Sequence, residues 1–424
     1  MNKTFQFCIY PTKKQVTILT TWLALCCQVY NAALQERRGA FRMAGISLGF
    51  AHQCAELPAC KDVYPELAQV NAQVLQNVVK RVDLAFQAFF RGCTTGEQTG
   101  YPRFKSRYRY HSLTFPQYAA PGKHGCFSLL KESNHKGKLI LSKIGHVKMV
   151  MHRPIQGRPK TAIVKRTPTG KWFVSICCEQ VKPIILAPSE EQVGIDVGLT
   201  SFASLSDGSH IDNPRFFRQE ERALAKAQRR REKEAKGSKE RRQQTKVVAR
   251  IHERIRNRRH NFIGQQVNLL VKRFGLIAVE ALIVRNLIKN PKLAKSISDV
   301  SWSAFFTRLV AKAEEAARQV VKVPPAYTSQ TCSCCGHRQE IPLSVRVYEC
   351  PVCGLVMDRD HNASVNILAK ACGRAGRVIP EAPSAEAVGS RHACTQGSIG
   401  VMVCPGSASA SSAQTIICRK VGEP

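Results

Sequence analysis

The sequence contains few acidic residues for its size. Its 424 residues include 30 Asp and Glu against 64 Lys and Arg, which gives a formal net charge of +34 at pH 7. Because each phosphate that Lys or Arg neutralises releases a condensed counterion, this imbalance favours a polyanionic partner such as nucleic acid. The alternatives are a solvated basic surface and attraction to a membrane, but the positive charge is spread along the whole chain rather than held in one tail.

Long apolar runs are also missing. The N-terminus, Met1-Asn2-Lys3, continues into alternating residues without the apolar core of a secretory signal. No window reaches the ~18 apolar residues of a membrane helix, since the best run, at 277–284, is interrupted by Glu280. We therefore expect a cytoplasmic protein with mostly reduced thiols and no membrane partner.

The first half of the chain predicts a helical segment set into a β domain. Alternating apolar residues predict a strand at 5–9, and Thr12-Lys13-Lys14-Gln15 has the form of a capping box that begins a helix. A second helical pattern spans 67–89. Short β-branched runs between turn signals predict strands at 138–141, 147–151, 161–165 and 171–177. We expect these strands to form a small β-barrel or sandwich, which the first strand completes.

From Gln192 the sequence is typical of an α/β domain. Apolar strands are expected at 193–196, 202–205, 276–280 and 319–323. The basic segment 217–260 holds 17 Lys or Arg against 6 Asp or Glu and breaks at Gly237-Ser238 into two expected helices. Beyond Ala371 the chain becomes small and irregular, which predicts a poorly ordered tail. Three cysteines in that tail have no obvious partners: Cys394, Cys404 and Cys418.

Two of the expected strands end in a carboxylate, Asp196 and Glu280, and a third acid, Asp360, stands just before an expected helix at 362–368. Phosphodiester hydrolysis by two metal ions about 4 Å apart needs several converging carboxylates, and Mg²⁺ prefers such oxygen ligands. Along the chain, an Asp at the end of one strand is followed by a Glu at the end of another and then by an Asp at a helix start. This order is the layout of the ribonuclease-H-like nuclease fold.

Each acid also has a structural interpretation. An Asp after a strand is often a turn or cap residue. Glu280 alone could be a partly buried carboxylate paired with Arg285, and Asp358 competes with Asp360 for the third position. Asp358 could instead pair with Arg359 or be a spare surface acid.

Four cysteines have the form C-x₂-C-x₁₄-C-x₂-C: Cys332, Cys335, Cys350 and Cys353. Two such turns of thiolates make a tetrahedral S₄ site, which favours one structural Zn²⁺. Glycines follow both pairs, at 336 and 354, as a close turn around a metal needs. Cys334 and His337 are alternative ligands that break the symmetry, and redox use of the C-x-x-C pairs is the other alternative.

Two segments are candidates for contact with nucleic acid. The segment 101–110 interleaves rings with cations, so its rings could stack on unpaired bases while its cations hold phosphates. An edge strand with a wet basic face is the alternative. The basic helices could be only a solvated surface, but their excess charge favours contact with a nucleic-acid backbone. The candidate contact residues are Tyr101, Arg103, Phe104, Lys105, Arg107, Arg229, Arg230 and Arg231.

Together these motifs resemble the TnpB family of transposon-encoded RNA-guided nucleases, which is related to type V CRISPR effectors. The resemblance covers the chain from the first strand to about residue 371, and it is most specific from Thr328 to Ala363. The residues that carry it are Tyr10-Pro11-Thr12-Lys13, Pro102-Arg103-Phe104-Lys105, Gly194-Ile195-Asp196-Val197-Gly198, Val279-Glu280-Ala281-Leu282, Tyr327-Thr328-Ser329-Gln330-Thr331-Cys332, Cys335-Gly336-His337, Cys350-Pro351-Val352-Cys353-Gly354 and Asp358-Arg359-Asp360-His361-Asn362-Ala363.

The resemblance implies a multidomain α+β architecture. A β-barrel wedge domain would comprise 1–11 and 94–190, with a helical recognition domain inserted at 12–93. A ribonuclease-H-like (RuvC) nuclease domain would comprise 191–324 and 356–371, with a zinc-ribbon insert at 325–355, and a poorly ordered tail would occupy 372–424. The long tail and the extra Cys334 depart from the family pattern.

The resemblance also implies an RNA-guided DNA endonuclease with Asp196, Glu280 and Asp360 as its catalytic triad on two Mg²⁺ ions. Its partners would be a guide RNA derived from the transposon end and target double-stranded DNA with an adjacent motif. Sequence choice would be delegated to guide pairing. Two alternatives stay open: an inactive or domesticated RNA- and DNA-binding regulator, and a guide-independent RuvC-like transposase or resolvase. The oligomeric state is not indicated.

Overall fold

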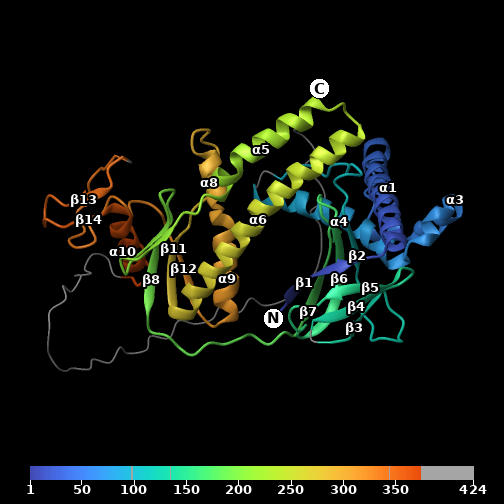
Figure 1. Ribbon diagram of the computed structural model, residues 1–424, viewed down its shortest axis with the longest axis horizontal. Coiled ribbons are helices and arrows are strands. Elements are labelled where there is room, and N and C mark those ends of the chain that lie inside the picture. The colour runs from blue at the N-terminus through green and yellow to red at the C-terminus, as the bar shows by residue number, and fades with distance from the viewer. Residues whose placement is uncertain (97–98, 134, 343, 374–424) are drawn as a thin grey trace. The chain divides into compact units, whose positions relative to one another are not determined.

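The computed structural model describes residues 1–96, 99–133, 135–342 and 344–373. The expected tail, with Cys394, Cys404 and Cys418, therefore lies outside the described residues except for its first two positions. The strands of the described chain form a seven-stranded sheet, a five-stranded sheet and a two-stranded sheet. Figure 1 shows how the sheets and the helices are arranged. The protein is an α+β structure, as the sequence predicts.

The seven-stranded sheet is entirely antiparallel and has the order β2-β6-β7-β1-β5-β4-β3. The first strand of the chain lies between β7 and β5, so it completes this sheet as expected. The sequence missed β2 and β3, which are the two edge strands. The strands are β1 (Lys3–Tyr10), β2 (Ser112–Phe115), β3 (Phe127–Lys131), β4 (Lys136–Leu141), β5 (Gly145–Val150), β6 (Arg158–Arg166) and β7 (Trp172–Glu179).

A helical segment separates β1 from the rest of its sheet. It consists of α1 (Lys13–Ala44), α2 (Phe50–Ala55), α3 (Leu57–Val63), η1 (Pro65–Gln69) and α4 (Ala72–Thr95). The capping box is present: the Thr12 hydroxyl accepts from the backbone of Gln15, whose side chain accepts from the backbone of Thr12. The second helix starts later than the periodicity predicts, because the side chain of Asn71 caps α4 and leaves Leu67 in η1.

Helix α1 is long and apolar enough to cross a membrane by length and composition alone, which the sequence analysis overlooked. Its apolar side chains are nevertheless used inside the protein. Leu19, Trp22 and Leu34 are buried in a core that α1 shares with α4 and the seven-stranded sheet. We therefore interpret α1 as a core helix.

The five-stranded sheet has the order β10-β9-β8-β11-β12. Strand β11 is parallel to both β8 and β12, whereas β9 and β10 are antiparallel to their neighbours. The sequence predicts every one of these strands except the short β10. The strands are β8 (Gln192–Asp196), β9 (Ser201–Leu205), β10 (His210–Asp212), β11 (Leu276–Glu280) and β12 (Gln319–Val323).

Helices cover both faces of this sheet (Figure 1). Odd-numbered residues of β8 and β11, such as Ile195 and Val279, pack with α6 (Lys239–Arg273) and α9 (Trp302–Glu315). The opposite face carries Ala278, which packs against Ile367 of α10 (Arg359–Ala371). Since side chains alternate along a strand, residues 194, 196, 278 and 280 all belong to the α10 face.

The cysteine-bearing segment folds around a short hairpin of β13 (Val347–Glu349) and β14 (Val356–Asp358), which leads directly into α10. Its small core contains Cys332, Cys350 and the fully buried Tyr348. We call residues 325–355 the ribbon below.

Candidate functional site

The first two acids lie side by side at the same edge of the five-stranded sheet. Ile195 of β8 pairs with Val279 of β11 in parallel register, so Asp196 and Glu280 end adjacent strands. Alternation points both side chains to the α10 face. Glu280 is 9% exposed and Asp196 is half-buried.

Helix α10 brings the third acid to this edge. Asp360 lies in its first turn, and the helix packs so closely on β8 that a Cβ on Gly194 would lie 2.0 Å from the backbone oxygen of Ser364. The Asp360 carboxylate lies beside Gly198, in the loop that follows Asp196, because a Cβ there would be 3.8 Å from Asp360 Oδ2. A glycine at 194 is therefore a condition for placing Asp360 near the strand acids.

The charges of the other two acids make Asp196 harder to ionise. Burial, followed by the negative charges of Glu280 and Asp360, raises the pKa of Asp196 well above its ordinary value. Burial also raises the pKa of Glu280, and burial together with the charge of Asp358 raises that of Asp360. Carboxylates that are partly or fully buried and lie near other carboxylates suit divalent cations.

The spacing of the acids bears on the number of ions. Among the described residues, the three acids do not form a set whose carboxylate oxygens all lie within 4.8 Å of one another. A two-ion centre does not require them to do so, because the outer ligands of a pair of ions about 4 Å apart need not reach the same ion.

The structural interpretations of the neighbouring charges are now distinguishable. Asp358 caps α10, since its Oδ1 accepts from the backbone N–H groups of Asp360 and His361 at 2.9 Å each. This makes Asp358 a helix cap, whereas the Asp360 carboxylate takes no part in the cap and lies 3.7 Å from the guanidinium of Arg346. Glu280 forms no ion pair with Arg285 within the part of the chain that the structure describes. Its Oε1 instead accepts from the Thr328 hydroxyl at 2.5 Å.

The four cysteines of the ribbon converge as their spacing predicts. Their sulfur atoms all lie within 4.8 Å of one another. The Sγ atoms of Cys332 and Cys353 are 3.6 Å apart, and those of Cys335 and Cys350 are 3.5 Å apart. A tetrahedral zinc ion with Zn–S bonds of about 2.3 Å requires sulfurs roughly 3.8 Å apart. The residues present therefore fit a structural zinc, and Cys334 and His337 lie outside the set.

The turns around the sulfurs are also built for a metal. Gly336 and Gly354 have φ values of 79° and 71°, which glycine adopts without strain. Burial works to raise the pKa of Cys350, but hydrogen bonds from the backbone N–H groups of Cys353 and Val352 and from the side chains of Cys335 and Cys353 lower it to about 6. Burial raises the pKa of Cys332 to about 12, so Cys350 is the thiol of this pair that is readily available as a thiolate.

Buried asparagines clamp the ribbon onto the helix that carries Asp360. Asn362 accepts from the backbone N–H of Ser333 at 2.9 Å and donates to the carbonyl of Thr331 at 2.7 Å. Asn366, one turn further along α10, donates to the carbonyls of Thr328 at 2.9 Å and Thr331 at 2.7 Å. The sequence analysis missed this clamp. Its signal was the pair of asparagines four residues apart on one helix face.

The segment 101–107 has no regular structure, so the edge-strand alternative is wrong. Tyr101, Arg103, Phe104 and Arg107 are exposed, as contact with nucleic acid requires. Tyr101 and Phe104 both lie near the guanidinium of Arg38, at 5.7 and 5.2 Å from ring centre to Cζ. Lys105 is only half-exposed, because its Nζ lies 4.1 Å from the centre of the Tyr30 ring.

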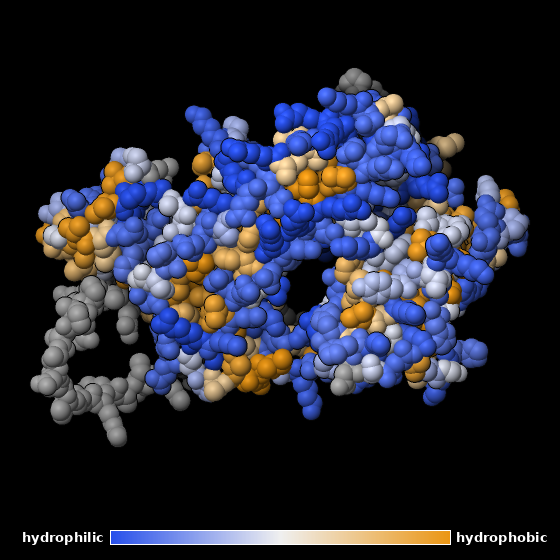
Figure 2. All heavy atoms as spheres, viewed as in Figure 1, coloured by the Kyte–Doolittle hydropathy of each residue, from blue (hydrophilic) through white to orange (hydrophobic). Residues whose placement is uncertain are grey.

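The basic segment forms a helical hairpin of α5 (Phe216–Lys233) and α6, which breaks at Gly237 and the N-cap Ser238 as expected. Figure 2 shows hydrophilic side chains over much of this hairpin. Arg229 and Arg230 are exposed and form no ion pair among the described residues. Arg231 is half-buried and pairs with Glu232. The structure thus leaves Arg229 and Arg230 freer than Arg231 to meet a phosphate.

Three family models match consecutive parts of the chain. A "Helix-turn-helix domain" model of the OrfB IS605 type matches residues 1–45, and the OrfB IS605 model described as "Probable transposase" matches 175–291. A model described as "Cas12f1-like, TNB domain" matches 302–367, which includes the ribbon and Asp360.

Curated relatives extend over nearly the whole chain. A "Putative RNA-guided DNA endonuclease" from Streptomyces pristinaespiralis is 34% identical over 384 residues, which cover 88% of this chain and 91% of the relative. The "Putative RNA-guided DNA endonuclease InsQ" of Escherichia coli K12 is 28% identical over 406 residues, which cover 90% of this chain and 97% of the relative.

A solved structure described as "Cryo-EM structure of the Cas12f1-sgRNA-target DNA complex" shares the fold, with a TM-score of 0.54 at 14% identity over 87% of this chain and 98% of that one. Sequence and fold agree with the motifs of the site. The chain belongs to the TnpB family, the OrfB proteins of IS605-type transposons.

Proposed function

We propose that this protein is an RNA-guided DNA endonuclease that hydrolyses target phosphodiesters at Asp196, Glu280 and Asp360. The observation that carries the proposal is their placement: two adjacent parallel strands and the first turn of α10 direct three acids to one edge of one sheet. The raised pKa of Asp196, to which the charges of Glu280 and Asp360 contribute, supports a shared cation site. The relatives named above are called RNA-guided DNA endonucleases, in agreement with this assignment.

The three acids would hold two Mg²⁺ ions. With the ions bound, the centre stabilises the attacking and leaving oxygens of an in-line displacement at phosphorus. The protein's own contribution is to fix the acids before substrate arrives: Thr328 orients Glu280, and the Asp358 cap fixes the start of the helix that carries Asp360. One structural Zn²⁺ on Cys332, Cys335, Cys350 and Cys353 would hold the ribbon in the form that the clamp grips.

The proposed division into domains follows the two sheets. Residues 1–11 and 94–190 would form the wedge domain, around a sheet that unites β1 with β2 to β7, and 12–93 would form the recognition domain. Residues 191–324 and 356–371 would form the RuvC domain, into which the ribbon at 325–355 is inserted. The division is supported by the separate strand orders of the two sheets.

The partners would be a guide RNA from the transposon end and double-stranded target DNA beside a short adjacent motif. The net charge of +34 supports binding to both backbones, and guide pairing would choose the sequence. Arg229 and Arg230 of α5, and Tyr101, Arg103, Phe104 and Arg107, are the exposed candidates for these contacts. The protein would act in the cytoplasm, in association with the nucleoid.

The test is guide-dependent cleavage by the full-length protein purified with its RNA, in Mg²⁺, on a target that matches the sequenced guide. We expect cutting of the matched target alone, abolished by Asp196→Ala with RNA and DNA binding retained. Binding without cutting by the unchanged protein would favour a regulator. Cutting that survives ribonuclease treatment would favour a guide-independent transposase or resolvase.

A further inference from the structure

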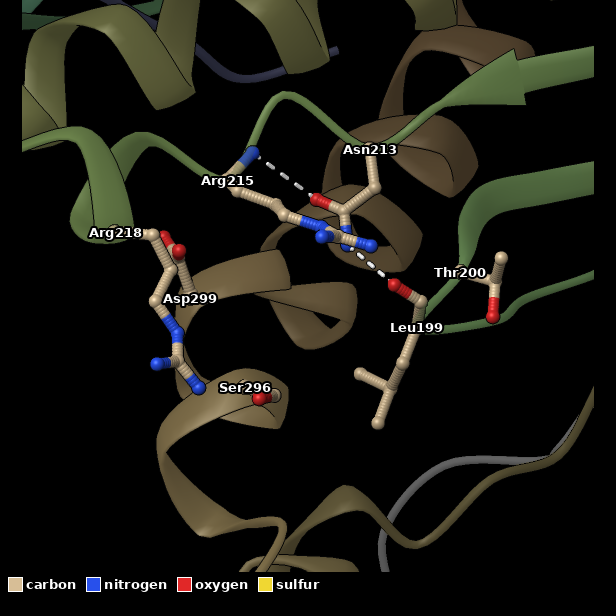
Figure 3. Close-up of a pocket in the computed structure, with 7 residues that line it drawn as sticks. All are labelled: Leu199, Thr200, Asn213, Arg215, Arg218, Ser296 and Asp299. Carbon is tan, nitrogen blue, oxygen red and sulfur yellow. Dashed lines mark hydrogen bonds between the residues drawn. The ribbon is translucent and has the colours of Figure 1, made fainter.

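A pocket of about 460 Å³ opens at the loop that follows Asp196, and Figure 3 shows the residues that line it. They are Leu199, Thr200, Asn213, Arg215, Arg218, Ser296 and Asp299. The sequence analysis placed Arg218 in the basic segment 217–260 but named none of the seven as a site residue, because they come from three separate segments of the chain. None is a ligand of either proposed metal site.

The topology places this pocket at the catalytic edge of the sheet. Leu199 and Thr200 belong to the loop that follows Asp196. Strand β10 runs antiparallel to β9 with Asp212 opposite Ser201, so Asn213 and its successors leave the sheet at the same edge. Helix α8 (Ala294–Val300), which carries Ser296 and Asp299, lies in the connection that leaves this edge after Glu280. All three segments that line the pocket therefore leave the sheet at the edge where Asp196 and Glu280 end their strands.

Positive charge in the pocket is available for a ligand. The Arg215 side chain is exposed and has no hydrogen-bond or ion-pair partner within the described ranges. Arg218 is 54% exposed and lies 3.7 Å from Glu221, whose carboxylate also contacts Lys295. In Figure 3 the Arg218 side chain extends toward Ser296.

The negative charge in the lining is already neutralised. Asp299 is 7% exposed, accepts from the backbone N–H of Phe217 and pairs with Arg259 at 2.9 Å. Because Asp299 occupies this N–H at the start of α5, the arginine side chains rather than the helix end are what the pocket offers to an anion. The backbone of Arg215 has a left-handed φ of 48°, and its N–H donates to the side chain of Asn213. The Asn213 side chain in turn donates to the carbonyl of Leu199 at 2.8 Å, which links two of the segments that line the pocket.

We propose that this pocket is a phosphate subsite that holds a phosphodiester of the DNA strand being cut, next to the scissile bond. The inference rests on the proposed function and deepens it. Arg215 and Arg218 grip the neighbouring phosphate and so set which bond of the strand lies over Asp196, Glu280 and Asp360. They are positioning residues, since they touch the substrate away from the reacting atoms.

The experiment combines protein variants with neutralised phosphates. Full-length protein with its guide RNA cuts a matched target in which a single methylphosphonate linkage is stepped along the cut strand at saturating target concentration. Arg215→Ala and Arg218→Ala are compared with the unchanged protein. Arg222→Ala is the matched control, because it removes the same charge one turn further along α5, outside the pocket.

We expect one linkage beside the cut to slow cleavage by the unchanged protein about tenfold, as the loss of a charged hydrogen bond would. The Arg215→Ala variant already lacks the contact with that phosphate, so it cuts the unmodified target about as slowly. Neutralising the same linkage should then slow its cleavage little further, and the two changes are not additive. The cut positions also spread over neighbouring bonds. Arg222→Ala keeps the position-specific effect, and the melting temperatures of all three variants stay near that of the unchanged protein.

Additive effects at every linkage, or an unchanged set of cut positions, would overturn the subsite. Loss of guide-RNA binding in Arg215→Ala would assign the pocket to RNA and overturn it as well. If the unchanged protein cuts no matched target, the proposed function itself fails. If the unchanged protein cuts and only the coupling is absent, the subsite alone is wrong.

Discussion

The hydroxyl of Thr328 donates to Oε1 of Glu280 across 2.5 Å, and both side chains are buried. Thr328 lies near the start of the ribbon, whereas Glu280 ends a central strand of the five-stranded sheet. The carbonyl of Thr328 accepts from Asn366 of α10. One residue therefore joins the ribbon, the second acid and the helix that carries the third.

We predict that Thr328→Val slows cleavage tenfold to roughly a hundredfold, because a buried hydrogen bond to a charged group contributes about 1.5–3 kcal/mol. Thr328→Ser keeps the hydroxyl and should retain most of the activity. Burial raises the pKa of Glu280 and the Thr328 bond lowers it, so its loss should move the acidic limb of the pH–rate profile to higher pH. Rate measurements across pH check this. Equal rates for the Val and Ser variants would contradict it.

Asp196→Asn should stabilise the protein in buffer without Mg²⁺. Burial and the charges of Glu280 and Asp360 raise the pKa of Asp196 in the folded state, so its ionised form destabilises the fold. This loss of stability is absent below the ordinary pKa of 3.8, and it grows as the pH rises from there through the raised pKa of the folded state. Thermal melting should thus show a higher melting temperature for Asp196→Asn near neutral pH, and no difference in strong acid. The reverse pH dependence would show that Asp196 is held as a stabilising anion.

Cys350→Ser should lose zinc and lower the melting temperature by several degrees, because metal binding is coupled to folding of the ribbon. Asn366→Leu should lower the free energy of unfolding by about 1–3 kcal/mol, since it leaves the buried carbonyl of Thr328 without a donor and leaves that of Thr331 with Asn362 alone. It should do so with zinc content unchanged. Metal analysis and chemical denaturation separate the two effects. A zinc-loaded, fully stable Cys350→Ser variant would refute the assignment of the ligands.

Gly194→Ala should abolish cleavage while guide RNA remains bound. The new methyl group would lie 2.0 Å from the backbone oxygen of Ser364, so α10 must move away from β8 and take Asp360 with it. Gly39→Ala is the control, because nothing lies within 4 Å of its Cβ position in α1 and alanine is the better helix former by about 1 kcal/mol. Normal cleavage by Gly194→Ala would show that the close approach of α10 is not needed.

Sequence reasoning reached the site where local patterns determine it. Apolar alternation predicts the strands that end at Asp196 and Glu280, and cysteine spacing predicts the sulfur cluster, because both signals are contained in short segments. The Thr328–Glu280 bond joins residues 48 positions apart, and the pocket joins three segments, so no local pattern announces them. Lys105 looked free to bind phosphate for the same reason, since its contact with Tyr30 depends on tertiary packing.

Anomalous X-ray scattering from crystals of the protein–RNA–DNA complex grown with Mn²⁺ tests the central claim most directly. We predict manganese peaks coordinated by Asp196, Glu280 and Asp360 together, separate from a zinc peak within the ribbon. Manganese bound elsewhere, with the three carboxylates directed to different surfaces, would contradict the account.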